Sequence, residues 1–402
     1  MNKKNIYNYG LTYEFPIKKS NLNNPMCKIY SINKGIVDIN LITEKSTSIT
    51  PPYTPANIRQ AYNMNNITGN PTGKNIIIAI IDAYAYANVT TDLTTYCNQF
   101  GLKTPNIITN TASLTANAPA GKFNFMVKKM SSFTAQNTGW ALEQALDIQM
   151  AHAVAPDAGI LLVQATSASY SALSNAIQYA INAGAKIISL SWGSGEFSSE
   201  ANYTIFNNNN VIFTVSSGDD PSVSFPSANN NVISVGGTNL INTDGDWSET
   251  GWVSSGGGIS AYMPVKYQNL AFNTQYGPQT NTKRQTPDIS CVADPDTGVY
   301  VRFNNQWYQV GGTSASAPIM AGIIALANQI RKTNNKLALT SSVLLTGLYN
   351  MIKNAVVNTY PNSLNDITSG TSGTNSAITG YDLVTGCGTP KCTNFVPYLA
   401  GL

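Results

Sequence analysis

Lys74-Asn75-Ile76-Ile77-Ile78-Ala79-Ile80-Ile81-Asp82 is the strongest fold signal in the chain, because it is an almost unbroken run of β-branched residues. A continuous apolar run of this length indicates a strand that is buried on both faces, as in a parallel sheet. Shorter runs of similar character follow at residues 122–127, 159–164, 186–192, 211–216 and 232–235.

Helical patterns lie between most of these runs. They cover residues 93–100, 140–153 and 171–183, with a weaker one near 198–206. Strands that alternate with helices predict an α/β protein with a mostly parallel central sheet flanked by helices. Such sheets bind their ligands beyond the carboxyl ends of the strands.

The domain boundary is expected at Pro51-Pro52-Tyr53-Thr54-Pro55. Residues 1–50 are rich in Asn and Lys, lack a clear periodicity and are predicted to be an N-terminal extension. Thr54-Pro55 can open a short helix over residues 56–62. Residues 240–310 are interpreted as long loops with short strands, and a helix near 341–351 precedes a loop-rich tail.

Composition narrows the class of protein. Charged residues make up 11% of the 402 residues, less than half the usual share of about 25%. Because only 20 residues are acidic, their protonation in acid adds little net positive charge, which suits an acidic environment. A net charge of +3 without a basic stripe argues against nucleic-acid binding. No apolar run approaches the ~20 residues of a membrane span. The five cysteines resemble no metal site, and the sequence leaves open whether Cys387 pairs with Cys392.

A candidate nucleophile lies in Gly311-Gly312-Thr313-Ser314-Ala315-Ser316-Ala317-Pro318, which opens a long apolar helix. Ser314 would lie at the positive end of that helix, where backbone N–H groups stabilise a developing negative charge. The alternative is that Ser314 or Ser316 only caps the helix. Pro318 is expected early enough in the helix for its missing N–H to matter little.

Two acidic residues share one face of the predicted helix at 140–153. Glu143 and Asp147 are four residues apart, so their side chains lie close together in surroundings that are apolar on almost every side. Like charges in a buried helix disfavour each other. The pair is therefore interpreted as a dyad that shares a proton, with one member acting as a base below neutrality. The alternative is that this face reaches solvent.

His152 is the only histidine, so a Ser-His-Asp triad would have to use it, with Asp82 as its acid. It follows Glu143 by nine residues, which places it roughly 180° away around a helix at about 100° per residue. If the acidic face points to the site, His152 points away, and a core or helix-end role is expected.

These stretches together resemble the sedolisin family of serine-carboxyl peptidases, acid-acting relatives of the subtilisins. Gly312–Ser316 is similar to the nucleophile motif, Glu143–Asp147 to the paired-carboxylate helix, and Ser217-Gly218-Asp219 to the segment of the oxyanion aspartate. The similarity extends in collinear order over residues 51–402. Further matching segments are Tyr53-Thr54-Pro55, Ala79–Tyr84, Leu190-Ser191-Trp192-Gly193, Val235–Thr238, Ser255–Ser260 and Pro287–Ser290.

The resemblance implies a subtilisin-like three-layer fold and a role for each site residue. Ser314 would be the nucleophile, Glu143 the general base, Asp147 its orienting partner and Asp219 the oxyanion donor. The implied activity is acid endopeptidase cleavage of proteins or peptides through an acyl-enzyme. Two alternatives stand beside it: a tripeptidyl-peptidase of the same family, and a catalytically silent protein that keeps the fold.

The tail is similar to the family's calcium loops, at Asp366-Ile367-Thr368 and Ile378-Thr379-Gly380-Tyr381-Asp382. The implied ligands of one structural Ca²⁺ are the carboxylates of Asp366 and Asp382 and the carbonyls of Ile367, Ile378 and Gly380. Family members usually have glycine where Ile378 stands. The alternative is that the two aspartates only cap loops.

The resemblance also raises the question of control. Family precursors usually carry a long N-terminal prodomain, and about 50 residues are too few for one. Either this member dispenses with it, or another segment or chain takes over. No signal peptide is recognised in the first residues, whereas the resemblance implies a secreted protein or an acidic compartment. A monomer is expected.

Overall fold

The computed structural model describes residues 24–25, 28–30, 49–132, 136–272, 274–278, 282–354 and 359–402. Its main sheet has the strand order β12-β11-β9-β7-β3-β6-β5-β4, and β15 also pairs with β11. All pairings in this sheet are parallel except that of β11 with β12. The strands are β3 (Ile77–Ala83), β4 (Thr104–Ile107), β5 (Lys122–Lys129), β6 (Gly159–Ala165), β7 (Ile187–Leu190), β9 (Ile212–Ser216), β11 (Ile233–Thr243), β12 (Asp246–Gly251) and β15 (Ile289–Val292).

The isoleucine run forms β3, which lies in the interior of this sheet. Ile78 is opposite Ile160 of β6 and Ile187 of β7, and all seven residues of β3 are buried. Ile78 and Ile80 join the apolar cluster on one face, whereas Ile77 and Ile81 join that on the other. The prediction of a strand buried on both faces is confirmed.

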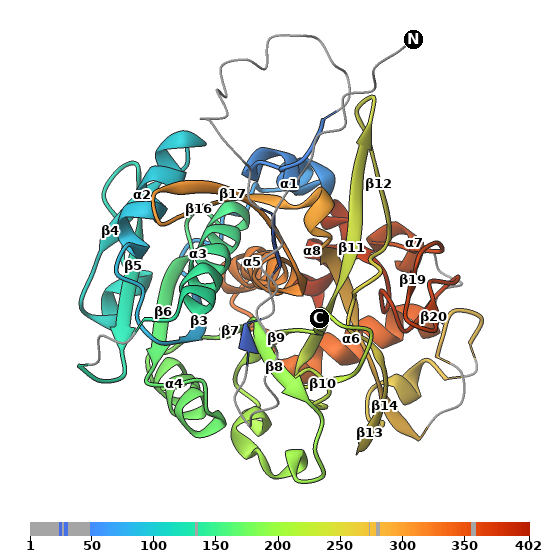
Figure 1. Ribbon diagram of the computed structural model, residues 1–402. Helices are drawn as coiled ribbons and strands as arrows, with labels where there is room; N and C mark the ends of the chain where they lie inside the picture. Colours follow the sequence, from blue (N-terminus) through green and yellow to red (C-terminus); the bar gives the residue numbers. More distant parts are fainter. Residues whose placement is uncertain are drawn as a thin grey trace, which may run out of the picture.

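Helices cover both faces of the sheet, which completes the predicted three-layer α/β fold (Figure 1). On one face, α3 (Thr138–Val154) packs against α5 (Thr313–Thr333); a Cβ added at Gly322 would lie 2.6 Å from the Cβ of Val154. On the other face lies α4 (Tyr170–Asn182). The larger cluster also takes in α1 (Pro55–Ala61), α2 (Val89–Gln99), α6 (Ser341–Lys353) and α8 (Cys392–Gly401).

The region predicted as loops contains more strand than expected. β11 continues to Thr243 and forms a hairpin with β12. Asp244 and Gly245 form the turn with φ of 53° and 98°, as a two-residue type I′ turn requires. This Asp-Gly pair was the signal for the hairpin. The other strands of the region are β13 (Gly258–Pro264), β14 (Lys283–Thr286), β16 (Val299–Phe303) and β17 (Gln306–Gly311).

Two other expectations are wrong. Residues 198–206 form the short 3₁₀ turns η4 (Glu200–Asn202) and η5 (Thr204–Asn207) in place of an α-helix. The run at 186–192 is divided at Ser191, where β7 ends and β8 (Trp192–Gly195) begins. β8 leaves the main sheet and pairs with β10 (Ser224–Phe225). Among the described residues of the tail, α8 and the short α7 (Thr359–Ser363) are helical.

Two strands come from the predicted N-terminal extension, most of which lies outside the described residues. β1 (Asn24–Pro25) pairs with β8, and β2 (Lys28–Tyr30) pairs with β17. Of the described cysteines, Cys97, Cys291, Cys387 and Cys392 are buried free thiols, so Cys387 and Cys392 do not pair. No helix in the described parts of the chain is both long and apolar enough to span a membrane.

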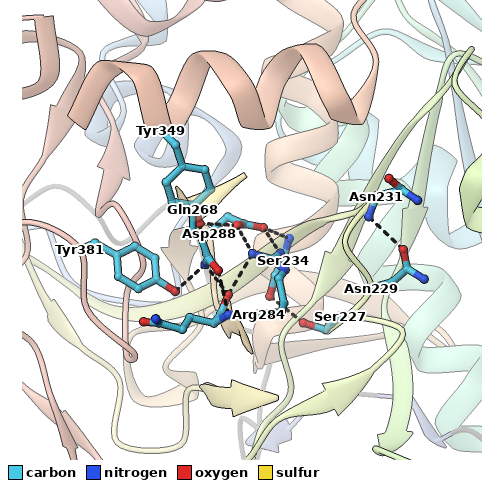
Figure 2. Close-up of polar contacts among 10 residues, drawn as sticks. Ser227, Asn229, Asn231, Ser234, Gln268, Arg284, Asp288, Tyr349 and Tyr381 are labelled. Atoms are coloured by element: carbon cyan, nitrogen blue, oxygen red, sulfur yellow. Dashed lines mark hydrogen bonds and ion pairs between the residues drawn. The ribbon is translucent and has the colours of Figure 1, made fainter. Parts of the chain in front are cut away.

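A buried ion pair fixes the connection between β14 and β15 (Figure 2). The Arg284 guanidinium donates to both carboxylate oxygens of Asp288, at 2.6 Å each. Asp288 also accepts from the Tyr349 hydroxyl at 2.6 Å and from the Ser234 N–H at 2.8 Å. The Gln268 amide donates to the hydroxyls of Tyr349 and Tyr381, at 3.0 and 3.2 Å. The network joins the central sheet to α6 and to the loop of the predicted calcium site.

Candidate active site

Ser314 is the second residue of α5, which begins directly after a glycine pair that the backbone geometry requires. Gly312 is the N-cap with φ of 104°, a conformation that favours glycine, and a Cβ at Gly311 would lie 2.3 Å from a carbonyl oxygen. The N-cap residue is Gly312 and neither serine occupies that position, so the capping alternative is wrong for both serines. The Ser316 hydroxyl instead donates to the carbonyls of Cys291 and Val292.

Pro318 lies inside α5, beyond the first turn, where its missing N–H removes one donor of the helix. An α-helical N–H donates to the carbonyl four residues earlier, so the N–H that Pro318 lacks would have bonded the carbonyl of Ser314. The Ser191 hydroxyl lies 3.4 Å from that carbonyl oxygen. In return, the Ser314 hydroxyl donates to the Ser191 carbonyl at 3.4 Å. α5 continues unbroken through Pro318 to Thr333.

The acidic helix is buried along its whole length after its first residue. Residues 139–154 of α3 are all buried, and Glu143 and Asp147 are both 0% exposed. The alternative of a solvent-facing acidic side is therefore wrong. Asp147 accepts a hydrogen bond from the Ser191 hydroxyl at 2.8 Å. Ser191 thus links the acidic pair to the backbone of Ser314.

The electrostatics of the site favour protonated carboxyls. Burial raises the pKa of Asp147 well above its usual value, and the negative charges of Asp82 and Glu143 raise it further. The Ser191 hydrogen bond opposes this rise, whereas a hydrogen bond with Glu143 adds to it. Burial also raises the pKa of Asp82. At neutral pH, ionising all three groups together is therefore strongly disfavoured.

Asp82 is the residue whose place the sequence reasoning missed. The sequence suggested it only as the acid of a histidine triad. Its charge instead acts on Asp147, so Asp82 belongs to the cluster of buried carboxyl side chains in the site. Its own side chain is 0% exposed at the carboxyl end of β3. A single acidic residue at the end of an apolar strand was the available signal, because site residues collect at this edge of a parallel sheet.

Asp219 lies against the N-terminus of α5. Its Oδ1 accepts from the Thr313 N–H at 2.8 Å and from the Thr313 hydroxyl at 2.9 Å. The Gly218 N–H donates to the same hydroxyl at 3.1 Å. The structure therefore brings Asp219 beside the residue that precedes Ser314, whereas the neighbouring Asp220 is exposed. The structure thus shows which of the two adjacent aspartates contacts α5, a choice that the sequence alone left open.

His152 lies away from this group, as the helix geometry predicts. Its ring stacks on Phe123 with centroids 3.8 Å apart, and its Nε2 lies 2.8 Å from the carbonyl oxygen of Lys103. Both partners belong to the β4–β5 side of the sheet. Burial lowers the pKa of His152 to about 4, so it is neutral over most of the pH range. It is a core residue.

The depressed pKa of His152 predicts a measurable loss of stability in acid. The unfolded chain takes up this proton near pH 6.5 but the folded chain only near pH 4, so stability falls as pH decreases through that window, by about 3 kcal/mol. His152→Gln keeps a donor for the Lys103 carbonyl and removes the titration. Urea unfolding at pH 7 and pH 4 should therefore show a smaller acid loss for the variant. Equal losses in both proteins would contradict the assignment.

The predicted calcium ligands meet in one loop cluster. Both carboxylate oxygens of Asp366 accept from the Gly380 N–H at 3.0 Å, and Oδ2 of Asp382 lies 3.4 Å from the Ile378 nitrogen. Ile378 is not among the described residues with positive φ, so its replacement of glycine carries no backbone strain. Ile367 packs in a small apolar cluster nearby.

This cluster has the chemistry of a hard-cation site. None of the ion pairs found among the described residues involves either aspartate, and both side chains are at least partly buried. The same described parts hold no group of three or more His, Cys, Asp or Glu side chains suited to a metal ion. Two carboxylates with three carbonyls would suit Ca²⁺ without such a group, and the ion stays a prediction. The hydrogen bonds also fit the loop-capping alternative.

The sequence of the chain is similar to that of known proteins. Residues 127–387, more than half of the chain, match the family model described as Subtilase family. Kumamolisin of Bacillus sp. (strain MN-32) is 29% identical over 86% of this chain and 63% of its own length. Tripeptidyl-peptidase 1 of Dictyostelium discoideum is 28% identical over 65% of this chain and 48% of its own length. The chain thus spans less than two thirds of these relatives.

The fold comparison agrees. A solved structure of Pseudomonas sedolisin, a serine-carboxyl proteinase complexed with pseudo-iodotyrostatin, superimposes with a TM-score of 0.71 at 25% identity. The match covers 88% of this chain and 99% of that one. The chain therefore belongs to the subtilase family, and within it to the sedolisins.

Proposed function

We propose that this protein is an acid-acting serine-carboxyl endopeptidase, which cleaves protein or peptide substrates through an acyl-enzyme. The observation that carries the proposal is the group of carboxyls, buried or partly buried, that is hydrogen-bonded towards the N-terminus of α5. Asp147 is hydrogen-bonded through Ser191 to the backbone of Ser314. Asp219 is hydrogen-bonded to Thr313, the residue before Ser314. The only histidine of the sequence lies elsewhere, against the Lys103 carbonyl, which leaves the acidic residues of the site as the candidate base.

The proposed reaction starts with attack of the Ser314 hydroxyl on a peptide carbonyl. Glu143 takes the hydroxyl proton as general base and later delivers it to the leaving amine. Asp147, held by Ser191, orients Glu143 and shares its proton. Asp219 donates a hydrogen bond to the oxyanion, which a carboxyl can do only while it is protonated. Water then hydrolyses the acyl-enzyme, and the same carboxyls serve in reverse.

Activity is expected to be highest in acid and to fall towards pH 8, because a carboxyl can serve as an oxyanion donor only while it is protonated. Asp219→Asn carries an amide that donates at any pH, so its ratio of kcat/KM at pH 7 to that at pH 4 should exceed the wild-type ratio. Cleavage of a denatured protein between pH 3 and 8 measures the pH profile of the wild type and that of the variant. Asp220→Asn, at the exposed neighbouring position, is the matched control and should keep the wild-type profile. A wild-type optimum near neutrality would refute the serine-carboxyl mechanism.

Release of tripeptides is the second candidate activity, favoured by the likeness to a protein named tripeptidyl-peptidase 1. Mass spectrometry of the products distinguishes endopeptidase activity from tripeptidyl-peptidase activity. An endopeptidase gives internal fragments of varied length, whereas a tripeptidyl-peptidase releases three residues at a time from the amino terminus.

We also propose one structural Ca²⁺ at Asp366, Asp382 and the carbonyls of Ile367, Ile378 and Gly380, on the strength of the donor set and its shared loop. Chelation should lower the melting temperature of the wild type, because a ligand that binds the folded state stabilises it. Asp366→Asn should melt lower and respond less to chelator. A melting temperature that chelator leaves unchanged in the wild type would exclude a stabilising ion.

A further inference from the structure

The edge of the main sheet that lies opposite the candidate site is rich in lysine. The strands from β9 to β4 run parallel, so their first residues lie along one side of the sheet. This amino-terminal edge comprises residues 72–76, 101–104, 119–122, 155–159, 184–187 and 207–212, with residues 332–340 after α5. Six exposed lysines lie in it: Lys74, Lys103, Lys122, Lys186, Lys332 and Lys336.

Contacts between neighbouring segments hold the lysines of the middle strands together. Lys186 immediately precedes β7, and its carbonyl accepts from the Ile212 N–H at the start of β9, at 2.9 Å. The Lys332 ammonium donates at 3.2 Å to the carbonyl of Asn75, which follows Lys74 before β3. The end of α5 thus brings its lysines to the first residues of the sheet.

The same edge continues to β5 and β4. The Thr104 N–H, next to Lys103, donates at 3.0 Å to the carbonyl of Gly121, next to Lys122. Lys103 forms an ion pair with Asp157, which lies before β6. Asp157 is the only acidic residue in the seven segments, all of which the structure describes. Five of the six lysines are therefore without a carboxylate among these segments.

The charge of this edge exceeds that of the whole chain. Six lysines and one aspartate give it a net charge of +5, whereas the chain carries +3. The lysines come from five separate segments, so the sequence shows no basic stripe. Only the parallel sheet gathers them on one side of the molecule. A surface of this kind attracts polyanions.

Apolar side chains accompany the lysines. Leu337 directly follows Lys336 and is 87% exposed. Val343 of α6 is 36% exposed, and α6 starts at this edge, because the Ser341 N–H donates to the Val211 carbonyl at 3.4 Å. Lysines beside exposed apolar side chains suit anionic lipid, where the charge meets headgroups and the apolar group enters the interface.

The composition of the edge favours lipid over nucleic acid. Arginine matches the geometry of a phosphate with two donors, and aromatic side chains stack on bases. The seven segments contain neither arginine nor an aromatic residue. An exposed leucine gains nothing from a phosphate backbone.

We propose that the amino-terminal edge binds the surface of a membrane that contains anionic phospholipids, with the lysines at the headgroup phosphates and Leu337 in the interface. The candidate site lies at the carboxyl ends of the same strands. β3 spans seven residues, and at about 3.3 Å per residue it separates the two edges by roughly 20 Å. The bound protein therefore presents its site to the solution. This inference does not depend on the proposed function.

Sedimentation of the full chain with lipid vesicles tests the surface. The vesicles contain phosphatidylcholine alone or three parts of it to one part of phosphatidylglycerol. The wild type should bind the anionic vesicles at low salt, bind the neutral ones far more weakly, and be released in ~0.5 M NaCl. Lys74→Gln with Lys186→Gln and Lys332→Gln should lower the partition coefficient roughly 100-fold, because each lysine contributes about fivefold.

Two further variants separate the surface from net charge. Lys129→Gln with Lys283→Gln and Lys353→Gln removes the same charge at the end of β5, the start of β14 and the end of α6. This matched control should stay within about threefold of the wild type. Leu337→Ser should bind anionic vesicles roughly tenfold less, because an inserted leucine is lost. Thermal unfolding checks that each variant folds.

Three results would overturn the inference. The first is no binding of the wild type to anionic vesicles at low salt. The second is an equal loss of binding in the two triple variants, which would assign the attraction to net charge alone. The third is tighter binding to a short DNA duplex than to the vesicles, lost in the Lys74, Lys186 and Lys332 variant but unchanged in Leu337→Ser, which would assign the edge to nucleic acid.

Discussion

Replacing Ser314 with alanine lowers kcat/KM for peptide cleavage in acid by roughly 10⁴- to 10⁶-fold, if Ser314 is the nucleophile, because no other group can form the acyl-enzyme. The substitution should leave stability close to that of the wild type. The hydroxyl makes one long hydrogen bond, 3.4 Å to the Ser191 carbonyl, so little is lost from the fold. Glu143→Gln should lose roughly 10²- to 10⁴-fold by removing the base.

Ser316→Ala is the matched control for Ser314→Ala. Both serines are 0% exposed on the same helix, but the Ser316 hydroxyl donates to two carbonyls at the end of β15. Its loss should cost about 1 kcal/mol of unfolding free energy and leave kcat/KM within tenfold of the wild type. Steady-state kinetics and urea unfolding of the two variants should therefore give opposite patterns. Comparable activity losses in both would mean that the helix N-terminus, not the hydroxyl of Ser314, had been disturbed.

The sequence predicted the elements whose signals are local. β3 is a continuous apolar run, and α3 combines an apolar surface with two acids four residues apart, so the fold class and the closeness of Glu143 and Asp147 followed from spacing. The separation of His152 from that dyad followed from helix geometry alone. In these cases one periodicity decides the structure, and no distant contact overrides it.

Features that depend on pairing between distant segments could not be predicted. The place of Asp82 at the end of an apolar strand was a local signal for a site residue, but its partner Asp147 was not predictable, because the two meet only where β3 packs against α3. β8 separates from β7 because residues far along the chain, in β10 and β1, pair with it. The hairpin turn at Asp244 was a local signal, but the abundance of polar residues around it masked the strands.

The buried Arg284–Asp288 pair should be the most sensitive point of the fold. Its side chains are 3% and 0% exposed, so removing one partner leaves the other charge buried without compensation. Arg284→Met should lower the unfolding free energy by about 3–5 kcal/mol. Asp288→Leu should lower the unfolding free energy by a similar amount, because it also leaves the Tyr349 hydroxyl and the Ser234 N–H without their acceptor.

The double variant Arg284→Met with Asp288→Leu is the decisive comparison. It removes both charges, so it should be destabilised by less than the sum of the two single changes. Lys103→Met, at the exposed pair with Asp157, is the matched control and should cost no more than about 1 kcal/mol, because a pair whose lysine is 43% exposed is screened by solvent. Urea unfolding of the four variants measures these differences. Additive losses would mean that the two residues act separately, whereas a double-variant loss below the sum would assign the lost unfolding free energy to the ion pair itself.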